Sequence, residues 1–156
     1  MSLRILAYYL PQYYPIPEND EWWGKGFTEW TNVAKARPLF RGHVQPKIPA
    51  DLGFYDLRVP ETRQAQSDLA IKYGIDGFCY WHYWFGNGKV LLDYPIKKVL
   101  ETGKPEISFC FAWANQTWGG LPYGDGFERI LIEQTYPGIK EYEDYFYYVL
   151  PYFRDK

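Results

Sequence analysis

Aromatic residues with polar tips occur beside amide or imidazole side chains at three places in this sequence, each where an apolar run ends. An aromatic face can stack on the apolar face of a sugar ring, while amide and imidazole groups can orient its hydroxyls. Packing in the core or along a loop is the alternative for every such residue. The candidate binding residues are Tyr9, Gln12, Glu29, Trp30, His82, Tyr83, Trp84, Trp113, Asn115 and Gln116.

Carboxyl groups that could work as acid and base are few. Cleavage of a glycosidic bond by such groups needs a pair roughly 5–10 Å apart. The nearby carboxyl groups are those of Asp20, Glu21, Glu29, Asp76 and Asp125. Asp76 lies too early in its expected strand to reach a site, so it suits a turn or an ion pair. Glu29 is the strongest candidate for catalysis, with sugar binding and support of its loop or helix start as alternatives.

The elements that must position these residues follow a βαβαβα order. Strands are expected over 4–10, 74–84 and 107–114, where β-branched and aromatic residues gather between turn formers. Helices are expected over 60–73, 93–103 and 139–153, where apolar residues recur at helical spacing. This order implies parallel strands, and ligands of such folds bind outside the carboxyl ends of the strands. The three clusters of aromatic residues should therefore meet at one rim.

All three helices have a predicted apolar face, and the helix over 139–153 should kink or restart at Pro151. The face of the helix over 93–103 consists of Ile96, Val99 and Leu100. The inward residues of the helix over 60–73 are Thr62, Ala65, Leu69, Ala70 and Tyr73. Those of the helix over 139–153 are Ile139, Tyr142, Phe146, Val149, Leu150 and Phe153.

The segment 15–55 is expected to be a long insertion loop. Its prolines disfavour regular structure, although Thr28 could cap a short helix over 28–36. Its large apolar residues, such as Trp22, Leu39 and Phe40, should need burial. Later in the chain, a glycine-rich loop at 119–126 precedes a short apolar stretch at 130–132.

Composition bounds the class of protein. The 156 residues suffice for one domain, expected over 1–156, and aromatic residues make up 21% of them. A net charge of −2 without a basic cluster argues against a nucleic-acid partner, and no apolar run is long enough to span a membrane. The apolar start ends at Pro11, which argues against a signal peptide and favours a cytoplasmic location. Cys79 and Cys110 are expected to be reduced core thiols, and neither a metal site nor a cofactor is expected.

Several stretches together resemble the signature of the WbsX-like family. They are residues 15–33 (PIPENDEWWGKGFTEWTNV), Gln45-Pro46, 50–57 (ADLGFYDL), 77–84 (GFCYWHYW) and 113–115 (WAN). The family is described as glycosyltransferase-like and is associated with lipopolysaccharide or O-antigen gene clusters. It is related to the family 99 glycoside hydrolases, which are (β/α)8 barrels acting on mannose-containing glycans. The resemblance covers essentially the whole chain.

The resemblance implies an α/β fold that is the N-terminal part of a (β/α)8 TIM-type barrel. Such a barrel needs about 250 residues, and this chain supplies about three βα units. The paired catalytic glutamates of the related hydrolases lie in a Glu-Trp-x-Glu motif, whereas Glu29-Trp30-Thr31-Asn32 lacks the second acid. Many relatives have Glu where this chain has Gln116, which cannot transfer a proton.

The resemblance therefore implies a carbohydrate-active domain of bacterial surface-polysaccharide metabolism with a glycan as its partner, and the related hydrolases point to a mannose-containing one. Its full-length form would be a glycosidase or glycosyltransferase, and this chain alone would be inactive because its carboxylate pair is incomplete. Two alternatives stay open. The chain could be a non-catalytic glycan-binding module, or a structural fragment that forms homo-oligomers through its open sheet edges.

Overall fold

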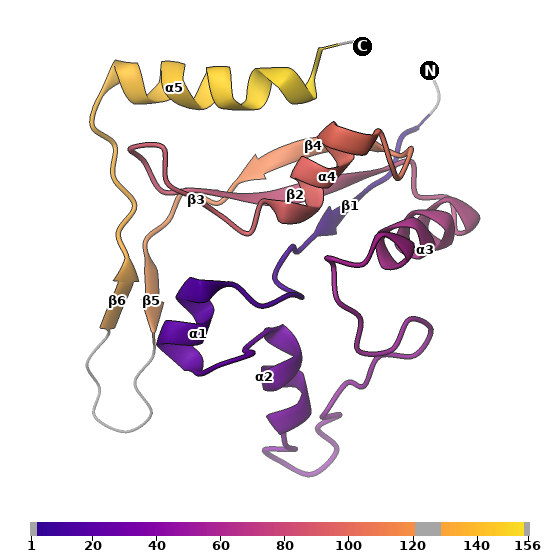
Figure 1. The fold of residues 1–156 in the computed structure, drawn as a ribbon. Helices are drawn as coiled ribbons and strands as arrows, with labels where there is room; N and C mark the ends of the chain where they lie inside the picture. Colours follow the sequence, from indigo (N-terminus) through magenta and orange to yellow (C-terminus); the bar gives the residue numbers. More distant parts are fainter. Residues whose placement is uncertain (1–2, 121–128, 155–156) are drawn as a thin grey trace.

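The computed structural model describes residues 3–120 and 129–154. Its centre is a four-stranded sheet (Figure 1). Strand β2 (Gly77–Trp84) pairs in parallel with β1 (Leu6–Tyr9) on one side and with β4 (Ser108–Trp113) on the other. The three predicted parallel strands are therefore confirmed. The end of β2 also pairs antiparallel with the short strand β3 (Val90–Leu91).

The sheet is open. No pairing between β1 and β4 closes a barrel within the described ranges. The fold is thus mixed α/β with a largely parallel sheet. This confirms the predicted α/β class but not the predicted barrel. A separate antiparallel pair, β5 (Trp118–Gly120) and β6 (Arg129–Ile132), follows β4 and contains the apolar stretch predicted at 130–132. Asp125 and most of the predicted glycine-rich loop lie outside the described residues.

Three helices pack on one face of the sheet, which we call the helix face. They are α3 (Pro60–Lys72), α4 (Tyr94–Thr102) and α5 (Ile139–Val149), close to the predicted bounds. Phe78, Tyr80, His82 and Trp84 of β2 point to this face, because side chains alternate along a strand. As predicted, the chain restarts at Pro151, within the 3-10 turn Leu150–Tyr152.

The predicted buried face of α5 is partly wrong, although Val149 and Leu150 are half-buried as expected. Ile139 exposes 80% of its surface, and Tyr142 and Phe146 are also exposed. Instead α5 turns Tyr145 and Tyr148 onto the sheet, where their rings contact Trp84 and His82. Aromatic residues occur all around this helix, so the helical period fits two faces. Tertiary contacts decide between them: the Tyr148 hydroxyl donates to Asp93 Oδ2 at 3.0 Å.

The predicted face of α3 is also partly wrong. Tyr73 is exposed, and Leu69 and Ala70 are only half-buried. The residues that α3 buries are Arg63 and Ser67. Arg63 is tolerated there because its Nη1 donates to the carbonyls of Leu57 and Arg58 at 2.7 and 3.0 Å, which satisfies part of the buried guanidinium.

The segment 15–55 contains more regular structure than its prolines predict. Helix α1 (Pro17–Trp23) was not predicted. It forms because Pro17 occupies the first turn, where proline is favourable. Helix α2 (Glu29–Lys35) matches the expected short helix, and Thr28 forms its capping box. Leu39 and Phe40 are exposed, contrary to the expectation of burial.

The sheet face opposite the helices is open to solvent, and we call it the open face. Tyr8 exposes 78% of its surface there, and Leu6 exposes 45%. Tyr8 packs edge-on against Trp81 of β2, and these two residues line a hollow of about 470 Å³ together with Tyr9 and Leu10. Cys79 and Cys110 are free thiols, and neither is fully buried, which corrects the expectation of two core thiols. A large apolar surface on one side of the sheet is therefore uncovered in this chain.

Candidate functional site at the carboxyl ends of the strands

Gln12, Glu29 and Tyr83 meet at the carboxyl end of the sheet. Gln12 follows β1, Tyr83 lies near the end of β2, and Glu29 begins α2. The Gln12 Nε2 atom donates a hydrogen bond to the Tyr83 hydroxyl. The backbone N–H of Glu29 donates to the carbonyl of Gln12 at 3.4 Å. The long segment after β1 thus returns to the sheet and delivers a carboxylate beside an amide and a phenol.

The electrostatics keep the Tyr83 phenol neutral. Burial raises the pKa of Tyr83 to about 12, the hydrogen bond from Gln12 lowers it, and the nearby Glu29 carboxylate raises it. The hydroxyl oxygen already accepts from Gln12, so its proton remains available to donate. Tyr83 therefore keeps its proton at neutral pH, while it exposes 2% of its surface and belongs to the buried core.

Glu29 is half-buried and keeps acceptor capacity. Its Oε2 atom accepts from Asn32 Nδ2 at 3.2 Å, within the same helix. Its charge also raises the pKa of Tyr13, after the larger effect of burial. A carboxylate so placed can accept hydrogen bonds from sugar hydroxyls, and its neighbours Tyr13 and Tyr83 provide aromatic surface.

Two other carboxylates of this region have structural roles. Asp20 Oδ1 accepts from the backbone N–H of Gly26 at 2.8 Å and holds the turn after α1. Asp76 Oδ2 accepts from the backbone N–H of Ile5 at 2.7 Å, a structural contact between the starts of β2 and β1 in place of the predicted turn or ion pair. Of the carboxylates proposed from the sequence and described by the structure, Glu29 is the one placed beside Gln12 and Tyr83.

Tryptophan side chains pack beside the Gln12–Glu29–Tyr83 cluster. The Trp118 ring lies 4.8 Å from that of Tyr83 and 5.9 Å from that of Trp22. The ring centroids of Trp30 and Tyr13 lie 4.4 Å apart, and the Trp30 Nε1 donates to the carbonyl of Tyr55 at 2.7 Å. Trp118 was not among the sequence candidates. Its position just after the Asn115-Gln116 pair was the available signal.

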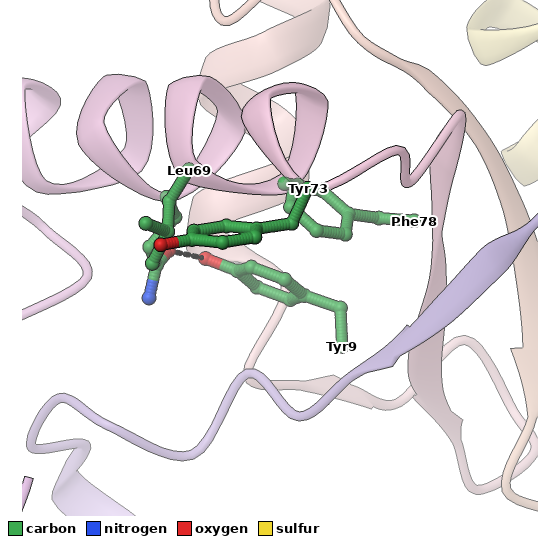
Figure 2. A pocket seen from close by; sticks show the side chains of 6 residues that line it. Tyr9, Leu69, Tyr73 and Phe78 are labelled. Carbon is green, nitrogen blue, oxygen red and sulfur yellow. Dashed lines mark hydrogen bonds between the residues drawn. The ribbon is translucent and has the colours of Figure 1, made fainter.

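Tyr9 lies on the helix face. Figure 2 shows its ring beneath α3, beside Tyr73 and Phe78. Its hydroxyl donates to Gln66 Oε1 at 2.7 Å, and burial raises its pKa. These contacts join β1 to α3. They place Tyr9 on the opposite side of the sheet from Tyr8, so its predicted ligand contact stays untested but has a structural alternative.

His82, Trp84 and Trp113 lie under α5. The His82 ring stacks against Tyr145 and Tyr148, and burial lowers its pKa to about 4. The indole N–H of Trp84 donates to Glu141 at 2.6 Å, and that of Trp113 donates to the carbonyl of Trp84 at 2.8 Å. The structure does not bring these three side chains together with Gln12 and Tyr83.

Asn115 and Gln116 lie at the end of β4 and are exposed. The Asn115 carbonyl accepts from the Tyr136 hydroxyl at 2.6 Å. Their side chains remain accessible to a ligand, but a role in binding is a prediction that no contact tests.

The described residues contain no group of three or more His, Cys, Asp or Glu side chains that could hold a metal ion. Among the helices of residues 3–120 and 129–154, none has the length and apolar character needed to cross a bilayer. The chemistry available at the Gln12–Glu29–Tyr83 cluster is that of hydrogen bonding, aromatic contact and one carboxylate.

This arrangement defines an α/β protein in which Gln12, Glu29 and Tyr83 lie at the carboxyl ends of parallel strands, the position where ligands of such folds bind. The chain belongs to the family described as Glycosyltransferase WbsX, whose profile matches residues 5–156. The family suggested by the sequence motifs is thus confirmed.

Two relatives from two strains of Xanthomonas campestris pv. campestris, including strain B100, carry the name "Uncharacterized protein WxcX". Each is 50% identical over 136 residues, which is 87% of this chain and 19% of the relative. The chain therefore spans about a fifth of the length of these curated relatives. No solved structure matches the chain.

Proposed function

We propose that this chain is a glycan-binding part of a carbohydrate-active protein in bacterial surface-polysaccharide synthesis, located in the cytoplasm. The observation that carries the proposal is the convergence of Gln12, Glu29 and Tyr83 at the carboxyl end of a parallel sheet. Membership of the Glycosyltransferase WbsX family supports a saccharide as the ligand class. Mannose-containing glycans, including those of lipopolysaccharide, are the ligands to examine first.

Each residue of the cluster has a role in this proposal. Gln12 fixes the Tyr83 hydroxyl, Tyr83 donates to a sugar oxygen, and Glu29 accepts from a sugar hydroxyl. Trp118 supplies an aromatic surface beside them. The buried His82 and Trp84 act through the packing of α5. Binding, not turnover, is the activity assigned to this chain.

We further propose that the sheet is the beginning of a (β/α)8 barrel whose interior is the open face. In such barrels the helices lie outside and the active site lies at the carboxyl ends of the strands. The helix face and the Gln12–Glu29–Tyr83 cluster correspond to these two features. Additional strands would then bring the second carboxyl group that glycosyl chemistry requires.

The test is a binding titration with mannobiose, with galactobiose as the comparison sugar, followed by NMR and tryptophan fluorescence. We expect Tyr83→Phe to weaken binding about 5- to 10-fold, because one hydrogen bond contributes roughly 1 kcal/mol. Glu29→Gln should weaken it at least as much, since a charged acceptor is lost. Tyr147→Phe on the exposed side of α5 is the matched control.

Equal affinities of Tyr83→Phe and the unmodified chain would overturn the placement of the site. Absence of saturable binding by either sugar at millimolar concentrations would overturn the glycan-binding proposal for this chain. Loss of binding in Trp84→Phe, with no loss in Tyr83→Phe, would move the site to the surface near α5.

A further inference from the structure

Residues 35–48, at the end of α2 and after it, form a loop that gathers positive charge, and we call it the basic loop. It contains four cationic residues, Lys35, Arg37, Arg41 and Lys47, and no acidic residue occurs between Trp30 and Ala50. All four cations are exposed, and none forms an ion pair within residues 3–120 and 129–154. The net charge of −2 for the whole chain thus conceals a local excess of positive charge, contrary to the expectation of no basic cluster.

The same loop exposes large apolar side chains. Leu39, Phe40, Val44 and Ile48 each expose between 57% and 83% of their surface. Exposed apolar side chains gathered in this way mark a surface that binds a partner. The basic loop lies beyond α2, at the end of the molecule opposite α5 (Figure 1). Closure of the proposed barrel would leave it on the surface, because loops that follow barrel strands lie there.

The tip of the basic loop is held in one shape by His43. The backbone N–H of Leu39 donates to His43 Nδ1 at 3.2 Å, and that of His43 donates to the carbonyl of Phe40 at 3.1 Å. The imidazole stacks on the Phe40 ring, with centroids 4.6 Å apart and planes at 6°. Leu39 and Phe40 are therefore presented to solvent by an ordered turn, which loses little conformational entropy on binding.

The combination of charge and apolar surface selects the partner. A soluble polyanion such as a nucleic acid would pair with the cations but leave the apolar side chains in water. An apolar protein surface would cover those side chains but bury the cations without partners. An anionic bilayer offers phosphates to the cations and an apolar layer beneath them. We propose that the basic loop docks this chain on the surface of an anionic bilayer, with Leu39 and Phe40 in the interface.

The first test compares two kinds of vesicle by co-sedimentation with the chain. One kind contains equal parts of phosphatidylglycerol and phosphatidylcholine, and the other contains phosphatidylcholine alone. Each cation near an anionic surface strengthens binding about 5-fold, so the four together should favour the anionic vesicles at least about 100-fold. Salt should weaken this binding by screening the charges. Equal binding to both kinds of vesicle, or binding to neither, would overturn the proposal.

Variants with matched controls locate the contact. Arg41→Gln should weaken binding to the anionic vesicles about 5-fold, whereas Arg4→Gln, at an exposed position before β1, should not. Phe40→Ser should weaken binding at least about 10-fold, because its ring no longer leaves water. Phe146→Ser, at an exposed position of α5, is its control. Circular dichroism checks that each variant is folded, and equal effects of loop and control variants would refute docking through the basic loop.

Insertion of the tip distinguishes a bilayer from a soluble polyanion. Phe40→Trp and Phe146→Trp each add one tryptophan, at the tip of the basic loop and on α5. Brominated phosphatidylcholine in the anionic vesicles should quench the added fluorescence of Phe40→Trp and leave that of Phe146→Trp unchanged. Equal quenching of the two variants would contradict insertion of the tip. Binding of heparin without binding of the anionic vesicles would assign the cations to a soluble polyanion and overturn the proposal.

Discussion

At the scale of single residues, His82 links the packing of α5 to pH. It lies between Tyr145 and Tyr148, exposes 3% of its surface, and has no hydrogen-bond partner for Nε2. Burial lowers its pKa from 6.5 to about 4, because a charged imidazole is poorly solvated there; nearby Asp93 opposes this shift and Lys97 adds to it. The unfolded chain therefore binds a proton at pH values where the folded chain does not.

This difference predicts a loss of stability on acidification. The contribution of the neutral, buried His82 to the free energy of unfolding is fully present above about pH 6.5 and is lost as the pH falls toward 4. Between pH 7 and pH 5, His82 should lower the free energy of unfolding by about 2 kcal/mol. Urea unfolding at the two pH values measures it. His82→Gln should remove most of the difference, whereas His43→Gln in the segment before α3 should not. An unchanged pH dependence in His82→Gln would refute this role.

At the scale of elements, α5 is held by its tyrosines. Tyr145 contacts Trp84 and Trp113, while Tyr147, two residues later, is exposed. We expect Tyr145→Ala to lower the free energy of unfolding by about 2–4 kcal/mol, because a half-buried ring leaves a cavity. Tyr147→Ala should change it by less than about 0.5 kcal/mol. Comparison of their urea midpoints decides, and similar midpoints would show that α5 is not anchored through this face.

The strand β2 explains which parts of the fold and site could be predicted. Glycines and prolines bound the elements, so their order and the parallel pairing followed from the sequence. The sequence did not show which residues of β2 point to which face of the sheet. Its aromatic residues lie on both faces, and nothing local distinguishes Tyr83 from His82 and Trp84. Only the packing of α5 assigns His82 and Trp84 to the helix face and leaves Tyr83 beside Gln12.

The contacts between segments far apart in the sequence could not be predicted either. The pairing of Gln12 with Tyr83 joins residues 71 positions apart, and no periodicity predicts it. The prolines of the segment 15–55 predict no helix at its start, whereas Pro17 occupies the first turn of α1, where proline is favourable. Glu29 could be selected from the sequence because it lies within the aromatic-rich insertion.

At the scale of the whole molecule, the chain has one covered and one open sheet face. The open face carries Leu6, Tyr8, Leu10 and Trp81 around a hollow of about 470 Å³. Exposed apolar patches of this kind mark surfaces that another polypeptide segment covers, and unpaired edges of a sheet invite further strands. In the proposed barrel those segments come from the same polypeptide; in this chain alone, a second copy can take their place.

The chain alone should therefore self-associate as its concentration rises. Tyr8→Lys places a charge in the open face and should weaken association at least 10-fold, since burial of an aromatic ring contributes about 2 kcal/mol. Tyr147→Lys puts the same charge on the exposed side of α5 and should leave association unchanged. Sedimentation velocity over a concentration series measures both. A monomer at all concentrations, or equal effects of the two variants, would contradict association through this face, and a longer polypeptide that closes the barrel should stay monomeric because its own strands cover Tyr8.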